Sequence, residues 1–333
     1  MPLNSNTLSI YTRNDKNNFW INQTDEKEGL KFFIEKSKKV FSLKRTYTIV
    51  RDIKPAAPII FELITLILNA EEIMNELIEV IQHGKVVEVA LNRPKAFNAF
   101  NLEMISELAT VLTRLGVDSS VKGIAFTGRG KAFCAGGDLK WAVHFSEKPG
   151  SSFYKLASQL HIAVLEIRRM NKPVVTAING PAAGAGFALA LASDFRIMEK
   201  SAVLKQAYTS NGLSIDGGGT YTLPRMVGFA RALEIAAFDR PISAKQALEW
   251  GLATKVVEDG TALKGAIDML NELAKGSLHS FSWSKKLINE SFISSLESHL
   301  ELETEGLSSC ADHPDGKEGL HAFIEKRKPV FKC

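Results

Sequence analysis

Short apolar, β-branched runs alternate with stretches of helical periodicity from residue 85 onward, which limits the chain to few folds. The runs Lys85–Leu91, Val121–Thr127 and Pro173–Ile178 are typical of buried strands. Apolar residues recur at helical spacing over Asn101–Leu115, where Asn101 is suited to cap the helix, and over Ser152–Met170. Strands that alternate with helices predict an α/β fold with a parallel sheet.

After about residue 260 the strand pattern stops and helical spacing dominates. Helices are expected over Ala262–Lys275, Ser280–Ser295 and Leu300–Ala311. The sequence therefore predicts an α/β core over residues 74–260, followed by a helical C-terminal region over residues 261–333.

The N-terminal segment carries an internal repeat. Residues 25–41, DEKEGLKFFIEKSKKVF, match residues 315–331, DGKEGLHAFIEKRKPVF, at 12 of 17 positions. A third copy is absent from the sequence, so a solenoid is excluded. We place a domain boundary near residue 73 and predict that residues 1–73 are weakly ordered or loosely docked, because they have little apolar surface to bury.

Composition excludes several classes of protein. The chain has 333 residues, of which 23% are charged and 45% hydrophobic, unlike collagens, disordered chains or disulfide scaffolds. Its three cysteines lie far apart, which favours a reducing compartment and argues against a metal cluster. The net charge of +4 forms no basic stripe, so nucleic-acid binding is not expected.

The sequence also argues against a membrane protein. The most apolar run, residues 59–68, is interrupted by Glu62 and is too short to span a bilayer. The N-terminus lacks the charged-then-apolar layout of a signal peptide. A cytoplasmic location is therefore expected.

Two glycine-rich turns directly follow predicted strands. They are KAFCAGGDLK at residues 131–140 and NGPAAGAGFALALASD at residues 179–194. Neither has the phosphate-loop pattern, and glycines 180, 184 and 186 do not form the dinucleotide motif GxGxxG. Such turns expose backbone N–H groups, and two facing one point would form an oxyanion hole. The alternative is close packing of helix on sheet at small residues.

Residues 74–333 resemble the crotonase, or enoyl-CoA hydratase/isomerase, superfamily. The resemblance is carried by LNRPKAFNAF (91–100), GRGKAFCAGGDL (128–139), KPVVTAINGPAAGAGFALALASDFRI (172–197), NGLSIDGGGTYTLPRMVG (211–228) and ISAKQALEWGLATKVV (242–257). It implies a spiral of ββα units with a C-terminal helical region that mediates trimerisation, and trimers that often pair into hexamers. It also implies an acyl-CoA thioester substrate, with CoA only as part of that substrate, and no metal or other cofactor.

The resemblance assigns site residues one by one. It places the two backbone donors of the oxyanion hole, which stabilise a thioester enolate, at Gly137 and Ala185. Substrate and CoA contacts fall at a further set of positions: Lys95, Ala96, Ala135, Gly136, Asp138 and Leu139. Tyr208 would line the acyl pocket or donate a hydrogen bond, with packing in the core as the alternative.

The departures from the family pattern bear on the reaction. Hydratases of the family carry two glutamates, at positions that hold Ala188 and Tyr208 here. Water addition needs a group that activates water and a group that protonates carbon. The usual carboxylates for both tasks are missing, so a standard hydratase is not expected.

Asp216, in SIDGGGT, is the remaining acid. Its position resembles the single acid of Δ3,Δ2-enoyl-CoA isomerases and of the 1,2-epoxyphenylacetyl-CoA isomerase group. One carboxylate suffices to move a proton between two carbons of an allylic system. The alternative role for Asp216 is to cap a helix starting at Gly217.

Three hypotheses about function remain open. In the first, the chain is an isomerase that shifts a C=C bond through Asp216. In the second, it hydrates or hydrolyses an unusual, for example cyclic, enoyl-CoA. In the third, it is a non-catalytic CoA-binding subunit with the same fold.

Other candidate residues have simpler interpretations. We expect Asp138 to cap a helix entered at Leu139, Asp194 to fix a helix end, and Cys134 to be a small buried residue. His144 would reach the pocket or be a partly exposed helix residue. The basic side chains of residues 326–328 would neutralise CoA phosphates or only solvate the C-terminal end.

Overall fold

The computed structural model of the chain describes residues 8–14, 17–23 and 77–331. The chain divides into two units, Met1–Asn75 and Glu76–Cys333. In the first unit, β1 (Leu8–Asn14) pairs antiparallel with β2 (Asn17–Gln23), a hairpin that the sequence analysis did not predict. The predicted boundary near residue 73 and the first copy of the repeat, residues 25–41, lie outside the described residues.

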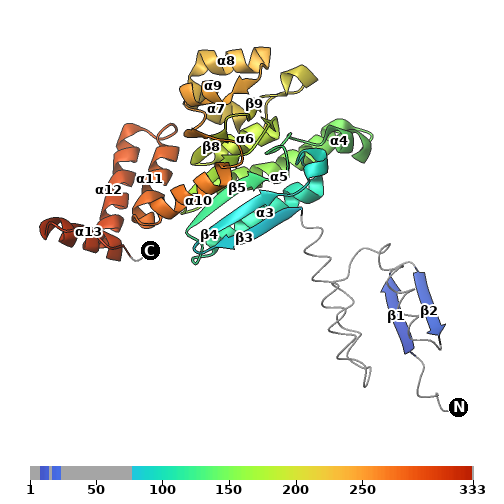
Figure 1. Ribbon diagram of the computed structural model, residues 1–333, viewed down its shortest axis with the longest axis horizontal. Coiled ribbons are helices and arrows are strands. Elements are labelled where there is room, and N and C mark those ends of the chain that lie inside the picture. Colours follow the sequence, from blue (N-terminus) through green and yellow to red (C-terminus); the bar gives the residue numbers. More distant parts are fainter. Residues whose placement is uncertain (1–7, 15–16, 24–76, 332–333) are drawn as a thin grey trace. The chain divides into compact units, whose positions relative to one another are not determined.

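A six-stranded sheet forms the centre of the second unit (Figure 1). Its order is β11-β8-β6-β5-β4-β3. The strands are β3 (Ile78–His83), β4 (Val86–Leu91), β5 (Gly123–Gly128), β6 (Val174–Ile178), β8 (Phe195–Glu199) and β11 (Lys255–Val257). All neighbours run parallel except β3 and β4. The three strands predicted from apolar runs correspond to β4, β5 and β6, which are buried along their whole length, so the predicted α/β class is confirmed.

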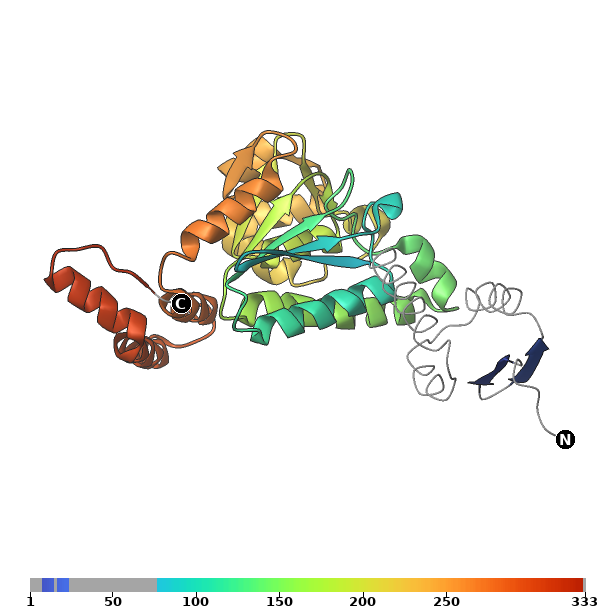
Figure 2. The same ribbon diagram turned by 60° about the horizontal axis from the view of Figure 1, so that its bottom comes forward.

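Helices cover both faces of this sheet (Figure 2). Helices α3 (Leu102–Val117) and α5 (Pro149–Arg169) pack against each other on one face. On the other face lies α10 (Ala262–Leu273), whose buried side chains pack against β4, β5, β6 and β8. The predicted cap of α3 is confirmed, because Asn101 Oδ1 accepts a hydrogen bond from the Met104 N–H at 3.0 Å.

A small second sheet includes part of the second glycine-rich turn. Its order is β10-β9-β7, formed by β7 (Ala182–Ala183), β9 (Val203–Lys205) and β10 (Ile242–Ser243). Directly after β7 comes α6 (Ala185–Ala192), which is buried at every residue, in accord with its uniformly apolar sequence. The chain then passes through a 3-10 turn, η4 (Thr209–Asn211), and the helices α7 (Gly219–Val227), α8 (Phe229–Phe238) and α9 (Ala244–Glu249).

The C-terminal region is helical, as predicted. After α10 come α11 (Leu278–Glu290), α12 (Leu296–Asp312) and α13 (Pro314–Ile324), and α13 holds most of the second copy of the repeat. Several large apolar side chains of this region are exposed: Leu296, Leu300, Leu307, Leu320, Phe323 and Ile324. Trimerisation through these helices stays a prediction. In the described part of the chain, none of the helices has the length and apolar character needed to span a membrane.

Candidate active site

The two glycine-rich turns are fastened to each other through their backbones. Cys134, in the first turn, forms an isolated parallel bridge with Ala182, at the start of the second. The Ala183 N–H donates to the Cys134 carbonyl at 2.8 Å, and the Cys134 N–H donates to the Pro181 carbonyl at 3.2 Å. These bonds bring two segments that are distant in sequence to one place.

Small residues are required where the turns meet. Gly136 has a φ of +93°, and a Cβ on it would lie 2.8 Å from the Ala183 carbonyl oxygen and 3.2 Å from the Ala185 nitrogen. A Cβ on Gly186 would lie 2.4 Å from the Cys134 carbonyl oxygen. Close packing at small residues, the alternative considered for these turns, is therefore present. It does not exclude a binding role for the backbone N–H groups of the same turns.

Gly137 and Ala185 supply backbone N–H groups that are open to a ligand. Both residues line one pocket, and neither N–H takes part in a hydrogen bond with the residues that the structure describes. Ala185 is the first residue of α6, where helical N–H groups have no intrahelical partner. Two free backbone donors on one pocket are what an oxyanion hole requires, and that role stays a prediction for Gly137 and Ala185.

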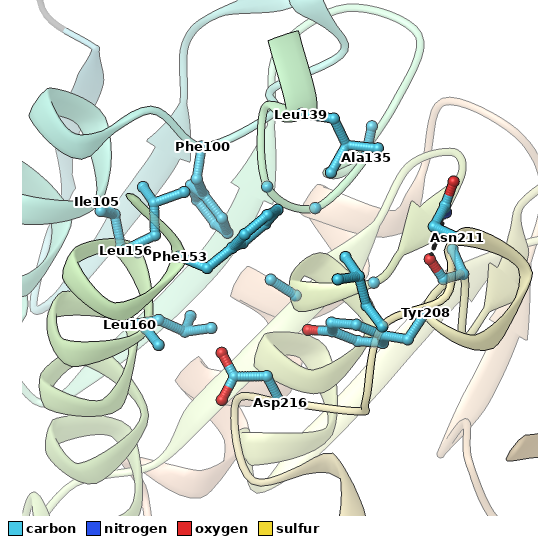
Figure 3. A pocket seen from close by; sticks show the side chains of 17 residues that line it. Phe100, Ile105, Ala135, Leu139, Phe153, Leu156, Leu160, Tyr208, Asn211 and Asp216 are labelled. Atoms are coloured by element: carbon cyan, nitrogen blue, oxygen red, sulfur yellow. Dashed lines mark hydrogen bonds between the residues drawn. The ribbon is translucent and has the colours of Figure 1, made fainter. Parts of the chain in front are cut away.

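The remainder of the pocket is mostly apolar (Figure 3). Helix α5 provides four of its side chains, Phe153, Leu156, Ala157 and Leu160. The other large apolar side chains are Phe100 before α3, Ile105 in α3, Leu139 in the first turn and Leu213 after η4. Such a surface suits the acyl chain of a thioester better than a charged ligand.

Asp216 is the only carboxylate among the residues that line this pocket. In Figure 3 its side chain lies between Leu160 and the hydroxyl end of Tyr208. Its Oδ1 is 2.7 Å from Nε2 of His161 on α5, and its side chain is 35% exposed. The capping interpretation is wrong: α7 begins at Gly219 with Gly218 as its N-cap, and no side chain caps it.

Ala188 and Tyr208 occupy the two positions at which the resemblance to the crotonase superfamily places the glutamates of hydratases. Ala188 is buried in α6. Tyr208 lines the pocket, and burial, together with the nearby Asp216 carboxylate, raises the pKa of its hydroxyl. The hydroxyl therefore stays protonated and able to donate a hydrogen bond at neutral pH.

Comparison with known proteins decides the family. Residues 81–333 match the family model described as enoyl-CoA hydratase/isomerase. The chain belongs to the enoyl-CoA hydratase/isomerase family.

Individual members of the family are similar over nearly their whole length. The chain is 36% identical to the 1,2-epoxyphenylacetyl-CoA isomerase of Escherichia coli over 74% of this chain and 94% of the relative. It is 33% identical to the short-chain-enoyl-CoA hydratase of Clostridium acetobutylicum over 77% and 97%. A crystal structure of an enoyl-CoA hydratase from Polaromonas superposes with a TM-score of 0.73 at 32% identity, over 77% of this chain and 99% of that one. Relatives of comparable identity are thus named isomerase and hydratase.

The structure brings together most of the residues assigned from the enoyl-CoA hydratase/isomerase pattern. Seven of them line the pocket: Ala135, Gly136, Gly137, Leu139, Ala185, Tyr208 and Asp216. Lys95 and Ala96 lie outside the pocket lining, in the 3-10 turn η3 (Pro94–Ala96), and their contact with CoA stays a prediction.

Asp138 has a structural role beside the pocket. Its carboxylate caps α4 (Leu139–Phe145) by accepting from the Trp141 N–H at 3.0 Å, as predicted, and pairs with Arg93 at 2.7 Å. Burial alone would raise the pKa of Asp138, but the Trp141 hydrogen bond and the Arg93 guanidinium lower it. The carboxylate is therefore held ionised by α4 and Arg93 and lies outside the pocket lining.

Cys134, His144 and Asp194 also have partners outside the pocket. Cys134 is fully buried, which raises the pKa of its thiol to about 12. His144 is exposed, with Nδ1 2.7 Å from the Lys140 carbonyl of its own helix, and lies outside the pocket lining, so of its two interpretations the exposed helix residue is confirmed. Asp194 accepts from the Val174 N–H at 2.8 Å and pairs with Lys285 at 2.9 Å, which ties β6 to α11 rather than ending a helix.

Of the basic residues 326–328 at the C-terminal end, Arg327 has acidic partners. Arg327 pairs with Glu318 and Glu325. Within the described ranges, no cluster of His, Cys, Asp and Glu has the arrangement of a metal site.

Sequence reasoning missed His161 and the apolar residues of α5 in the pocket. The helix itself was predicted, but no motif marks which of its residues face the site. Only the packing of α5 beside the two turns reveals this.

Proposed function

We propose that this member of the enoyl-CoA hydratase/isomerase family is an acyl-CoA isomerase that shifts a C=C bond by proton transfer through Asp216. The observation that carries the proposal is that one carboxylate lines the pocket, while positions 188 and 208 hold alanine and tyrosine. A single base can serve both halves of a proton shift, since it removes a proton from one carbon and returns it to another.

The proposed reaction uses the two backbone donors to hold negative charge. The thioester oxygen of a 3-enoyl-CoA accepts hydrogen bonds from the N–H groups of Gly137 and Ala185. Asp216 then takes the proton from C2, and the electron pair of that bond forms the dienolate. One donor of this kind typically contributes about 2.7–4 kcal/mol to transition-state stabilisation.

Reprotonation completes the shift. The protonated Asp216 returns its proton to C4, the double bond forms between C2 and C3, and the carboxylate is restored. The apolar side chains of α5 limit access of water to the dienolate, and the Tyr208 hydroxyl is placed to donate a hydrogen bond beside Asp216. We propose that the reaction needs no metal or redox cofactor.

Water addition to an enoyl-CoA is the second candidate. It is favoured by the 35% exposure of the Asp216 side chain, which would let a water molecule reach the carboxylate, and by the hydratase named among the similar proteins. Asp216 would then activate that water.

A panel of 2-enoyl- and 3-enoyl-CoA esters incubated in ¹⁸O-labelled or deuterated water separates the candidates. The proposal expects 3-enoyl-CoA to give 2-enoyl-CoA without ¹⁸O, with deuterium entering only at carbon. Incorporation of ¹⁸O into product would establish water addition or hydrolysis instead. Binding of the esters without turnover of any of them would indicate a non-catalytic CoA-binding subunit.

A further inference from the structure

We propose that His161 is a positioning residue for Asp216: it holds one carboxylate oxygen so that the other is presented to the substrate. The inference rests on the proposed function of Asp216 as the base. It assigns a role to a side chain that no motif in the sequence marks.

The contact is a direct one between a helix and a loop. Nε2 of His161 lies 2.7 Å from Oδ1 of Asp216, although the two residues are 55 positions apart. Because an ionised carboxylate only accepts hydrogen bonds, Nε2 carries the proton and donates it.

His161 is placed by the same helix that forms the apolar wall of the pocket. Leu156 and Leu160 on α5 line the pocket, and His161 is the next residue along the chain. Leu156 and Leu160 are buried, whereas the His161 side chain is 51% exposed. The imidazole therefore reaches Asp216 from the solvent side of the pocket and leaves the interior to the acyl chain.

The loop that carries Asp216 needs such an anchor. It lies between Gly212 and the glycine pair 217–218, all three with positive φ. The Asp216 carboxylate does not cap α7. Among the residues described by the structure, His161 is the side chain with which it pairs. With Oδ1 held by His161, Oδ2 is the oxygen available to accept a proton from substrate.

Positioning of this kind has a large effect on rate. Displacement of a reacting group by about 1 Å can cost on the order of 100-fold in rate. Loss of the His161 contact should thus lower kcat, while substrate binding, which depends on the turns and the apolar wall, should change little.

The kinetic test compares His161→Ala and His161→Gln with the control His144→Ala. His144 is another exposed helical histidine and lies outside the pocket lining. We expect His161→Ala to lower kcat for a 3-enoyl-CoA by about 10-fold or more with KM changed less than about 2-fold. His161→Gln, which keeps an N–H donor, should recover part of the loss, and His144→Ala should match the wild type. Wild-type kcat in His161→Ala, or a loss seen only in KM, would overturn the inference.

A second measurement does not depend on turnover. Long-range ¹H–¹⁵N NMR spectra show which ring nitrogen of a neutral histidine carries the proton, and the spectrum of His161→Ala assigns the His161 signals. The wild type should show almost only the Nε2–H form, whereas Asp216→Ala should show the mixture of both tautomers that a neutral imidazole has in water, in which Nε2–H is merely the major form. The same tautomer mixture in both proteins would show that His161 does not donate to Asp216, even if the wild type isomerises its substrate. Absence of isomerisation by the wild type, with the tautomer preference present, would instead count against the proposed function alone.

Discussion

The backbones of Cys134 and Ala182 form a parallel bridge, and this bridge fixes where the two backbone N–H donors of the pocket lie. Gly137 follows Cys134 by three residues, and Ala185 follows Ala182 by three. The geometry of the site thus depends on backbone contacts between two turns rather than on catalytic side chains.

Gly186→Ala tests this contact between the turns. The new Cβ would lie 2.4 Å from the Cys134 carbonyl oxygen and 2.6 Å from the Cys134 Cβ, which forces the turns apart. We expect a loss of about 1–3 kcal/mol in the free energy of unfolding, measured by denaturant titration, together with a loss of activity.

Gly150→Ala is the matched control for that change. Gly150 is also helical, and a Cβ there meets nothing within 4 Å. Its replacement should be neutral or stabilise the protein by up to about 1 kcal/mol. Equal stabilities for the two variants would show that the turns are not in close contact at position 186.

Asn98 links the loop before α3 to the first turn, and Asn98→Asp tests that link. Its buried Nδ2 lies within 3.1 Å of the carbonyl oxygens of Arg129, Ala132 and Phe133. The introduced carboxylate would place an acceptor against these three acceptors, so we expect a destabilisation of about 3 kcal/mol or more in equilibrium unfolding.

The control for this prediction is Asn289→Asp. Asn289 Oδ1 accepts from Arg168 at 2.6 Å, and its Nδ2 donates to the Arg168 carbonyl at 3.2 Å, so a carboxylate at this partly exposed position loses one hydrogen bond but keeps a cationic donor. The change should alter the free energy of unfolding by less than about 1 kcal/mol. Comparable losses in both variants would contradict the role assigned to Asn98.

Cys134 should resist alkylation in the folded protein. Burial raises the pKa of its thiol to about 12 from 9.0, so the reactive thiolate is suppressed at pH 8. Mass spectrometry after iodoacetamide treatment should find Cys310, which is partly exposed, modified faster than Cys134. Faster labelling of Cys134 in the native state would show that this site is open.

The raised pKa of Cys134 also makes the stability of the folded protein depend on pH. In the unfolded chain the thiol ionises near its ordinary pKa of 9.0, while in the folded chain it stays protonated to about 12. Its contribution to stability is complete below pH 9 and decreases as pH rises from there. Cys134→Ala should therefore show a smaller loss of stability between pH 8 and pH 10 than the wild type; an identical loss would contradict the assignment.

Much of the fold could be predicted from local patterns. The strands β4, β5 and β6 are continuous apolar runs, and Asn101 and Asp138 are standard helix caps. Each of these predictions used only residues that are close together along the chain. The hairpin of β1 and β2 was not predicted, since its residues show no apolar run of comparable strength.

The candidate site was predictable where the family pattern marks it. Gly137, Ala185 and Asp216 lie in quoted motifs and line one pocket. His161 and Asn98 carry no such signal. Their partners are 55 and 31–35 positions away, and only the packing of the turns and of α5 determines which side chains meet.

The role of Asp216 as the base is tested most directly by turnover of a 3-enoyl-CoA by Asp216→Asn, with Asp268→Asn as control. Asp268 is exposed on α10 and pairs with Lys264 at 2.5 Å, outside the pocket lining. We expect Asp216→Asn to lower kcat by about 10²–10⁴-fold while CoA binding and melting temperature stay near those of the wild type, and Asp268→Asn to have wild-type activity. Full isomerase activity in Asp216→Asn would contradict this role.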